Sequence, residues 1–129
     1  MSVKIRPFKL SDIMHLEVQK RHLAISPFLW RHFLLLGDML GPWSLTAEVD
    51  GVPVASYGTL GDGWTWALLE DGLGRHMIPV TRSIKRLLSS HVRVVGPVYA
   101  HIDEAHPEAV RWARILGFEP FEGKTWRFT

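Results

Sequence analysis

The sequence predicts a single domain of the α/β (α+β) class, in which a mixed, mostly antiparallel sheet is flanked by about four helices. Two patterns predict this class: short runs of alternating apolar residues typical of strands, and other segments with apolar residues at helical spacing. The two kinds of segment are interspersed, which gives the expected order β-α-α-β-β-β-α-β-α-β-β. No linker or repeat divides the 129 residues, so residues 1–129 are taken as one domain.

The first third of the chain is expected to hold one strand and two helices. Residues 3–8 predict a short strand that ends near a proline. A helix follows, with Ser11 as its N-cap. A second helix is expected to have Ser26 as its N-cap and to end at Gly37 or Gly41.

The middle of the chain predicts a hairpin, a further strand and a long helix. Residues 43–60 alternate in polarity before and after Asp50-Gly51, which is typical of two strands joined by a tight turn. Another strand is expected near residues 64–69, followed by a glycine-rich loop. The next segment has apolar residues at helical spacing, and we expect Pro79 in its first turns, where a missing N–H costs least.

The last third predicts a strand, a helix and two closing strands. The strand is expected within residues 94–104. The helix has Pro107 near its start and Gly117 just past its end, positions that these residue types favour. The closing strands are expected on either side of Glu122-Gly123.

The last helix is amphipathic. Ala109, Trp112 and Leu116 recur at helical spacing. We therefore expect Trp112 and Leu116 to face the core, and Arg111 and Arg114 to face solvent.

Composition excludes several kinds of site. The chain has no cysteine, which excludes disulfides, thiolate nucleophiles and cysteine metal sites. The net charge of +2 gives no strong signal for nucleic acid. The longest apolar run, residues 33–36, is far shorter than the ~20 residues of a membrane span. The charged N-terminus lacks the apolar centre of a signal peptide, so we expect a cytoplasmic protein with no membrane partner.

Three segments together resemble the GNAT superfamily of N-acetyltransferases. IRPFKLSDIMHL (residues 5–16) is similar to the family's opening strand and first helix, and DGLGR (71–75) to its pyrophosphate loop. HPEAVRWARILGFEPFE (106–122) is similar to its last helix, with the Leu-Gly-Phe ending and the next strand. The resemblance covers nearly the whole chain, from about residue 3 to 128. It implies a GNAT-like fold, acetyl-CoA as cofactor and an amine as acceptor.

The loop at residues 71–75 has the chemistry of an anion site. Glycines allow the backbone to turn tightly and expose N–H groups, and the next helix adds the positive end of its dipole. Arg82, Lys85 and Arg86 follow on that helix and offer further charge. The alternative is a structural turn beside a solvated basic face. The resemblance implies cofactor binding by Leu69, Gly72, Leu73, Gly74, Arg75 and His106.

The sequence departs from the family pattern at three positions. Leu69 stands where the loop usually begins with Arg or Gln, and His106 where the last helix often has Asn. Ala113 stands where the family often has the tyrosine that protonates the leaving thiolate of CoA. Alanine cannot donate a proton, so the resemblance implies a reduced catalytic set.

Glu70 and His101 are the candidate catalytic residues. Imidazole ordinarily titrates near neutral pH, which suits a general base, and Tyr99 is close to His101 in the pattern. The alternative is that these are surface or packing residues. His101, Asp103, Glu104 and His106 match no common metal-binding spacing, so no metal is expected.

Three functions remain open at this stage. The first is an acetyl-CoA-dependent N-acetyltransferase with weak or absent turnover. The second is a non-catalytic GNAT-like structural or binding protein, and the resemblance extends to such domains in bacteriophage virions. The third is a small regulator that binds CoA, or a protein partner, without turnover. Fold alone does not choose between them.

Overall fold

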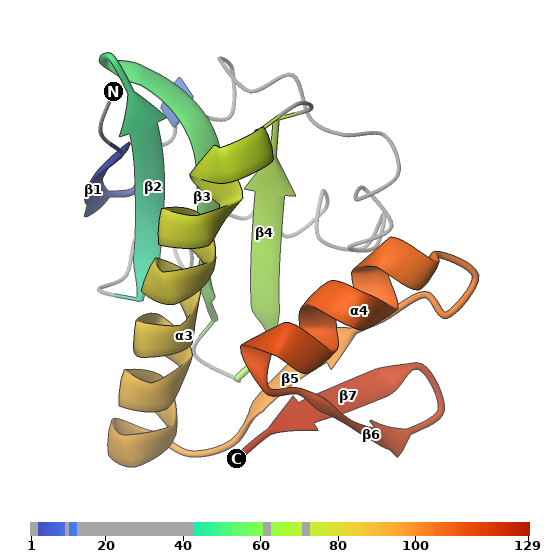
Figure 1. Cartoon of the computed structure of the whole chain (residues 1–129). Coiled ribbons are helices and arrows are strands. Elements are labelled where there is room, and N and C mark those ends of the chain that lie inside the picture. The colour runs from blue at the N-terminus through green and yellow to red at the C-terminus, as the bar shows by residue number, and fades with distance from the viewer. Residues whose placement is uncertain (1–2, 10, 13–42, 61–62, 71–72) are drawn as a thin grey trace.

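The computed structural model describes residues 3–9, 11–12, 43–60, 63–70 and 73–129. Strands and helices follow one another in the order expected for these residues (Figure 1). The elements are β1 (Val3–Pro7), β2 (Ser44–Val49), β3 (Val52–Thr59), β4 (Thr65–Leu69), the short 3-10 helix η3 (Gly74–His76), α3 (Met77–Val94), β5 (Val98–His101), α4 (Pro107–Leu116), β6 (Glu119–Glu122) and β7 (Thr125–Phe128).

The first sheet contains β1, β2, β3 and β4 in that order, and each neighbouring pair is antiparallel. The predicted hairpin of β2 and β3 is confirmed. Asp50 and Gly51 take φ angles of 52° and 80° in its turn, the left-handed conformation that a two-residue hairpin loop requires. Every residue of β3 after Val52 is buried, so both faces of this strand are covered.

The second sheet contains β5, β7 and β6, in that order, and its pairs are also antiparallel. The expectation of one mixed sheet is thus corrected in detail: two antiparallel sheets meet at a single parallel bridge between Trp64 and Tyr99. The sheets are separate because β5 pairs with β7 along the edge that faces away from β4. Beyond the bridge, β4 and β5 form no ladder with each other among the described residues.

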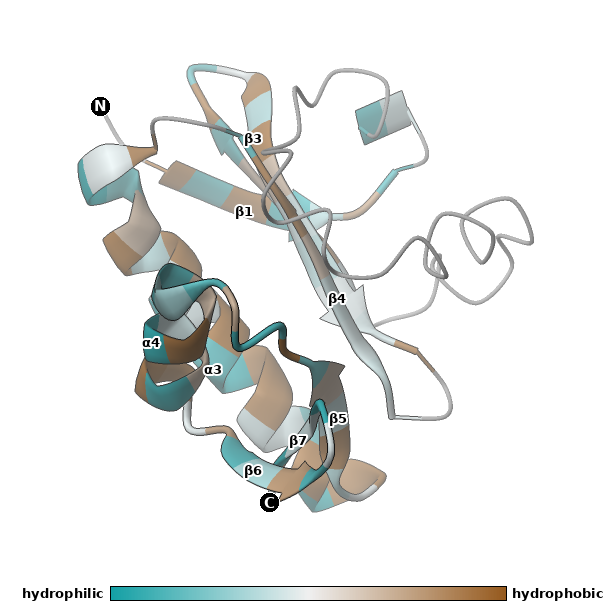
Figure 2. Ribbon diagram, turned by 90° about the vertical axis from the view of Figure 1, so that its right-hand side faces the viewer, coloured by the Kyte–Doolittle hydropathy of each residue, from teal (hydrophilic) through white to brown (hydrophobic). Residues whose placement is uncertain are grey.

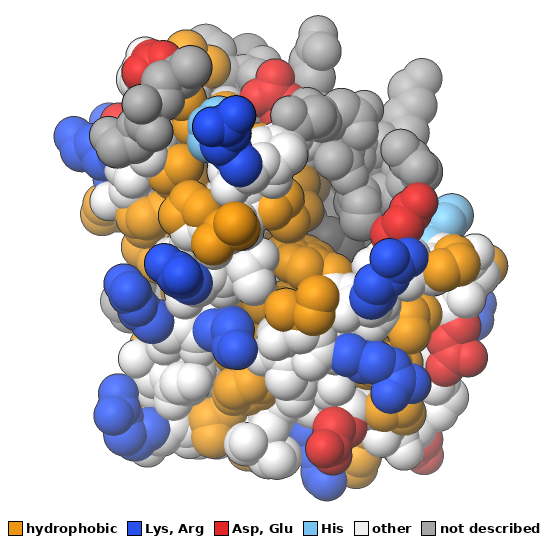
Figure 3. Space-filling model, in the orientation of Figure 1, with side chains coloured by type: hydrophobic (Ala, Val, Ile, Leu, Met, Phe, Trp, Pro, Cys, Tyr) orange, Lys and Arg blue, Asp and Glu red, His pale blue; other side chains and the backbone are white. Residues whose placement is uncertain are grey.

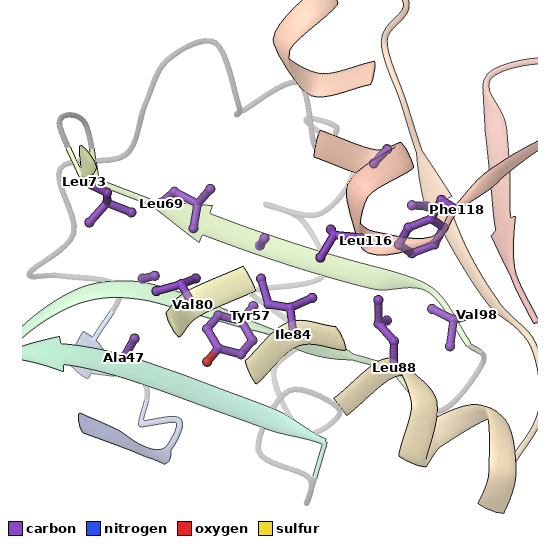
Figure 4. Close-up of a cluster of buried hydrophobic side chains, with 14 of the residues drawn as sticks. Ala47, Tyr57, Leu69, Leu73, Val80, Ile84, Leu88, Val98, Leu116 and Phe118 are labelled. Carbon is purple, nitrogen blue, oxygen red and sulfur yellow. The ribbon is translucent and has the colours of Figure 1, made fainter. Parts of the chain in front are cut away.

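The helices α3 and α4 lie on the same side of the first sheet (Figure 2). α3 packs along β3, and α4 covers the second sheet. Side chains from β3, β4, α3 and the end of α4 point toward one another in one apolar cluster (Figure 4). Val80, Leu88 and Val98 have no exposed surface in this cluster. The cluster also takes in Trp126 of β7, so one core joins the two sheets.

The ends of both helices agree with the prediction. Pro79 lies in the first turn of α3. Pro107 opens α4, His106 is its N-cap residue, and Gly117 ends it with φ 107°. A Cβ at Gly117 would also lie 2.9 Å from the Phe128 ring. Both the positive φ and this close contact therefore favour glycine at the position.

The predicted faces of α4 are confirmed for most of their residues. Leu116 is buried, and Arg111 and Arg114 are exposed. Trp112 packs against the core but is only partly buried, because its indole reaches across to α3. There its Nε1 donates a hydrogen bond of 3.1 Å to the Thr81 hydroxyl.

A buried carboxylate organises the N-terminal strand. Asp12 is 2% exposed and accepts hydrogen bonds from both Nη atoms of Arg6, at 2.7 and 2.9 Å. It also accepts from the Lys9 N–H at 2.8 Å and the Thr46 hydroxyl at 2.7 Å. The expected N-cap, Ser11, is instead already helical and exposed.

The two helices expected between residues 11 and 41 fall almost wholly outside the described residues, including Ser26, Gly37 and Gly41. Only Ser11 and Asp12 of that region are described, and both are helical. In the part of the chain that the structure describes, no helix is long and apolar enough to cross a membrane.

Candidate functional site: the β4–β5 split

β4 and β5 run parallel from one point of contact and then separate. The Tyr99 N–H donates a hydrogen bond of 2.9 Å to the Gly63 carbonyl beside the bridge. Gly63 is needed there, since its φ is 92° and a Cβ would lie 2.9 Å from the Pro97 carbonyl oxygen. Past this point the facing edges of the two strands form no ladder with each other. We call this region the β4–β5 split. Its strand edges can pair with an extended ligand.

The far end of the split leads into a helix N-terminus. After β4 the chain passes through Gly74, whose φ is 52°, and then through η3 into α3. Nothing lies within 4 Å of a Cβ built on Gly74, so the backbone is open to a ligand there. The cap residues of η3 and α3, Leu73 and His76, make no side-chain capping hydrogen bond, and neither first turn contains an acidic residue. The positive end of the α3 dipole is therefore offset by no carboxylate of its own first turn.

The loop residues differ in what they can offer a ligand. Leu69 and Leu73 are 2% and 6% exposed and belong to the apolar core, so only their backbone could contact a cofactor. Gly74 and Arg75 are exposed. Gly72 lies outside the described residues. Along α3, the basic side chains expected beside the loop are exposed: Arg82, Lys85 and Arg86.

The structure does not bring the two candidate catalytic residues together. Glu70 directly follows β4, and its N–H donates to the Val54 carbonyl at 2.9 Å. His101 is the exposed last residue of β5 and pairs with Thr125. Glu70 is six residues beyond the bridging Trp64, whereas His101 is two beyond Tyr99. At ~3.3 Å per residue, about 13 Å of strand separates their levels. Glu70 is thus at the loop end of the split, and His101 is near its closed end.

Comparison with known proteins identifies the fold. No protein-family model matches the sequence, and no curated protein matches it. Solved structures do match. The ribosomal-protein-S18-alanine N-acetyltransferase of Escherichia coli has a TM-score of 0.65 at 13% identity, over 98% of this chain and 90% of that chain. An acetyltransferase of Agrobacterium tumefaciens has a TM-score of 0.63 at 13% identity, with the same coverage.

A third match carries a ligand. The GNAT family acetyltransferase of Brucella melitensis, solved in complex with acetyl-CoA, has a TM-score of 0.57 at 16% identity. That match covers 99% of this chain and 88% of the other. The chain has the GNAT fold. The resemblance predicted from three short segments is therefore confirmed at the level of the fold.

Within this GNAT fold, α4 carries the departures from the family pattern. Ala113 is 2% exposed and lies in the core cluster, so the helix presents a methyl group where the resemblance implies a phenol. His106 has extended backbone angles as the N-cap residue, but its side chain makes no capping hydrogen bond. Its Nε2 instead lies 3.7 Å from a carboxylate oxygen of Asp103. Nowhere in the described residues do three His, Asp or Glu side chains converge as a metal site would require.

The sequence prediction missed two residues that shape the split. Gly63 permits the close approach of the two strands, and Trp64 forms the bridge. The Trp64 ring is also 6.2 Å from the Tyr99 ring. The glycine-rich turn before the strand was a local signal for Gly63. No local signal exists for a bridge between residues 35 positions apart in the chain.

Proposed function

We propose that this chain binds acetyl-CoA along the β4–β5 split and is an N-acetyltransferase-like protein with slow or absent turnover. The observation that carries the proposal is the split itself, which ends at an open, positive-φ glycine before a helix whose own cap residue makes no side-chain capping bond. A neighbour with the same fold was solved with acetyl-CoA, which supports this choice of cofactor.

The residues present fit such a cofactor. The backbone at Gly74 and Arg75, with the N-terminus of α3, would hold the anionic phosphates. The facing backbone groups of β4 would bind the amide-containing arm by the hydrogen bonds that an added strand makes. The bound cofactor supplies an acetyl thioester, an acyl group activated for transfer to an amine.

Among the described residues, His101 offers a base, whereas Ala113 stands where the resemblance implies an acid. His101 is exposed near the closed end of the split, where one of its ring nitrogens would accept a proton from an ammonium acceptor. Glu70 is at the loop end, close to where phosphates would bind, and a carboxylate there would be repelled by them. Ala113 can donate no proton. Since a positioned general acid is worth roughly 10²–10⁴ in rate, turnover should be slow.

A second candidate is a GNAT-fold protein that binds without catalysis. The observation that favours it is the burial of Ala113 in the core, which leaves no polar group on that face of α4. In this case the partner is a protein rather than an amine substrate. A thiol-release assay separates the two candidates: release above background with a mixture of amines, lost in His101→Ala, supports the enzyme.

Calorimetry of acetyl-CoA binding tests the site. Gly74→Val should weaken binding at least tenfold, because valine disfavours a positive φ. Gly74→Asn is the matched control, since asparagine adopts this conformation more readily and open space surrounds the position in both variants. Arg82→Ala should change the affinity less than Gly74→Val, because one exposed arginine is screened by salt. Equal binding by Gly74→Val and wild type would reduce the loop to a simple turn.

A further inference from the structure

A shallow groove lies between α4 and the β6–β7 hairpin, away from the β4–β5 split. It has a volume of about 500 Å³. Residues of α4, of β6 and β7 and of the turn before α4 line it, and none comes from β4, η3 or α3. We call it the α4 groove. It is therefore separate from the cofactor site proposed above, and nothing in that proposal requires it.

Two unpaired cations form one wall of the α4 groove. Arg111 and Arg114 are three residues apart on α4, so their side chains are neighbours on the helix surface. Both are exposed, and neither forms an ion pair within the described part of the chain. Like charges at this spacing destabilise a helix slightly. A binding partner with carboxylates would remove that repulsion.

The floor of the α4 groove is apolar and holds one of these cations in place. Val110 and Pro120 contribute the apolar surface, and the almost completely buried Trp126 also lines the groove. The Arg114 guanidinium lies 5.3 Å from the centroid of the Trp126 ring, within the range of a cation–π contact. Arg114 therefore stands at the edge of an apolar surface, and as an exposed side chain it can present hydrogen-bond donors to a ligand.

The shape and charge of the groove select the class of partner. Trp126 is only 1% exposed, so no aromatic face is available for stacking a nucleobase. The groove is too open to bury most of a small molecule, as small-molecule sites do. Glu104 at one end adds a negative charge that suits a cation or an N–H group. A peptide supplies all of these groups along one segment. Over the front of the molecule, Figure 3 shows basic side chains beside hydrophobic ones on α4.

We propose that the α4 groove docks an acidic peptide segment of a protein partner. Carboxylates of the segment pair with Arg111 and Arg114, and one apolar side chain covers Val110 and Pro120. Charge-assisted bonds from arginine to carboxylate give this contact its specificity.

Fluorescence anisotropy with the full chain tests the proposal. The probe is a fluorescein-labelled hexapeptide, Glu-Glu-Leu-Phe-Asp-Glu, and its neutral counterpart has Gln and Asn in place of the acids. The acidic probe should bind at least tenfold more tightly than the neutral one. Arg111→Glu/Arg114→Glu should weaken its binding at least tenfold, and Arg111→Gln/Arg114→Gln by a smaller factor. Both double variants change exposed residues, so they should keep the circular dichroism spectrum of wild type.

Arg93→Glu is the matched control. Arg93 is an exposed arginine at the end of α3, outside the groove, and its reversal should leave the affinity within twofold. Several results would overturn the proposal: no binding of the acidic probe, unchanged binding by the glutamate double variant, or an equal loss in Arg93→Glu. Tighter binding of an oligouridylate RNA would assign the groove to nucleic acid. A concentration-dependent dimer of the chain alone that Arg114→Glu dissociates would assign it to a second copy.

Discussion

The two sheets of this molecule differ in how completely they are buried. β3 is buried at every position after Val52, and β4 at every position after Thr65. In contrast, all four residues of β6 are exposed, and Phe121 within it is 48% exposed. In the first sheet, β3 and β4 are thus covered on both faces. The second sheet has one face against α4 and a more exposed edge.

This difference indicates where stability and function are concentrated. The split lies where the two sheets meet, so one wall belongs to the well-buried sheet and the other to the more exposed one. Substitutions of buried residues in the first sheet and in α3 should destabilise the fold. Substitutions on the outer surface of the second should leave it folded and change what it binds.

The largest expected effect is the loss of the buried carboxylate behind β1. Asp12→Ala removes one acceptor each from Arg6, the Lys9 N–H and the Thr46 hydroxyl, while Arg6 keeps its ion pair with Glu48 and Thr46 keeps its bond to Ser56. Breaking a buried ion pair from one side typically costs about 3–5 kcal/mol. Urea denaturation measures the free energy of unfolding. A loss below about 1 kcal/mol would mean that this network does not support the first sheet.

The same carboxylate should make the first sheet sensitive to acid. Burial alone would raise the pKa of Asp12, but hydrogen bonds from Arg6, the Lys9 N–H and Thr46 outweigh it, so the pKa lies below its ordinary value. A depressed pKa stabilises the fold above the carboxyl's unfolded pKa of about 3.9, and that stability is lost as pH falls through the lower folded value. Between pH 7 and pH 2, the free energy of unfolding should fall more steeply for wild type than for Asp12→Asn. Parallel curves would contradict this assignment.

The next largest loss of stability is expected from shortening a buried side chain of α3. Leu88 has no exposed surface, and Leu88→Ala should cost roughly 2–5 kcal/mol through lost burial and a cavity. Ile115→Ala on α4 is the matched control, since its side chain is 56% exposed and the change should be within about 0.5 kcal/mol. Similar losses of stability in Leu88→Ala and Ile115→Ala would contradict the contrast between the buried face of α3 and the exposed surface of α4.

A smaller effect is expected at the hydrogen bond that joins the two helices. Trp112→Phe keeps most of the apolar contact of α4 but removes the Nε1 donor to Thr81. A hydrogen bond of this kind contributes about 0.5–1.5 kcal/mol. Thr81→Val should have a similar cost, and the double variant should cost less than the sum. Additive losses would show that the two side chains do not interact.

The smallest effect is expected on the outer face of the second sheet. The Phe121 ring lies 4.3 Å from the Arg127 guanidinium and 5.9 Å from the Tyr99 ring, but half of it is exposed. Phe121→Ala should cost about 1 kcal/mol or less, since exposed cation–π contacts contribute roughly 0.5–1 kcal/mol. Thermal denaturation gives the comparison with Leu88→Ala. A larger loss of stability in Phe121→Ala than in Leu88→Ala would contradict the view that stability is concentrated in the first sheet and α3.

Much of the fold was predictable because its signals are local. The turn at Asp50-Gly51 and the helix end at Gly117 depend on backbone conformations that these residues adopt readily. The division into two sheets was not predictable, because strand pairing joins distant segments and β5 could have paired with β4 along its length. The burial of Asp12 was missed for a similar reason. Its carboxylate is fixed by Thr46, a residue far along the chain.

The candidate site was predictable to the same extent. Gly74 was placed correctly in a tight turn before a helix, since glycine allows the positive φ observed there. The distance between Glu70 and His101 was not available, because it depends on where β4 and β5 separate. The burial of Leu69, Leu73 and Ala113 also depends on tertiary packing rather than on the residues beside them in the sequence.

Amide hydrogen exchange with and without acetyl-CoA tests the central claim most directly, because it locates the ligand as well as detecting it. The account predicts slower exchange at residues 73–77, along β4 and along β5, with little change in β1, β2 and β6. No change at any amide, or protection confined to α4 and the β6–β7 hairpin, would contradict acetyl-CoA binding along the β4–β5 split.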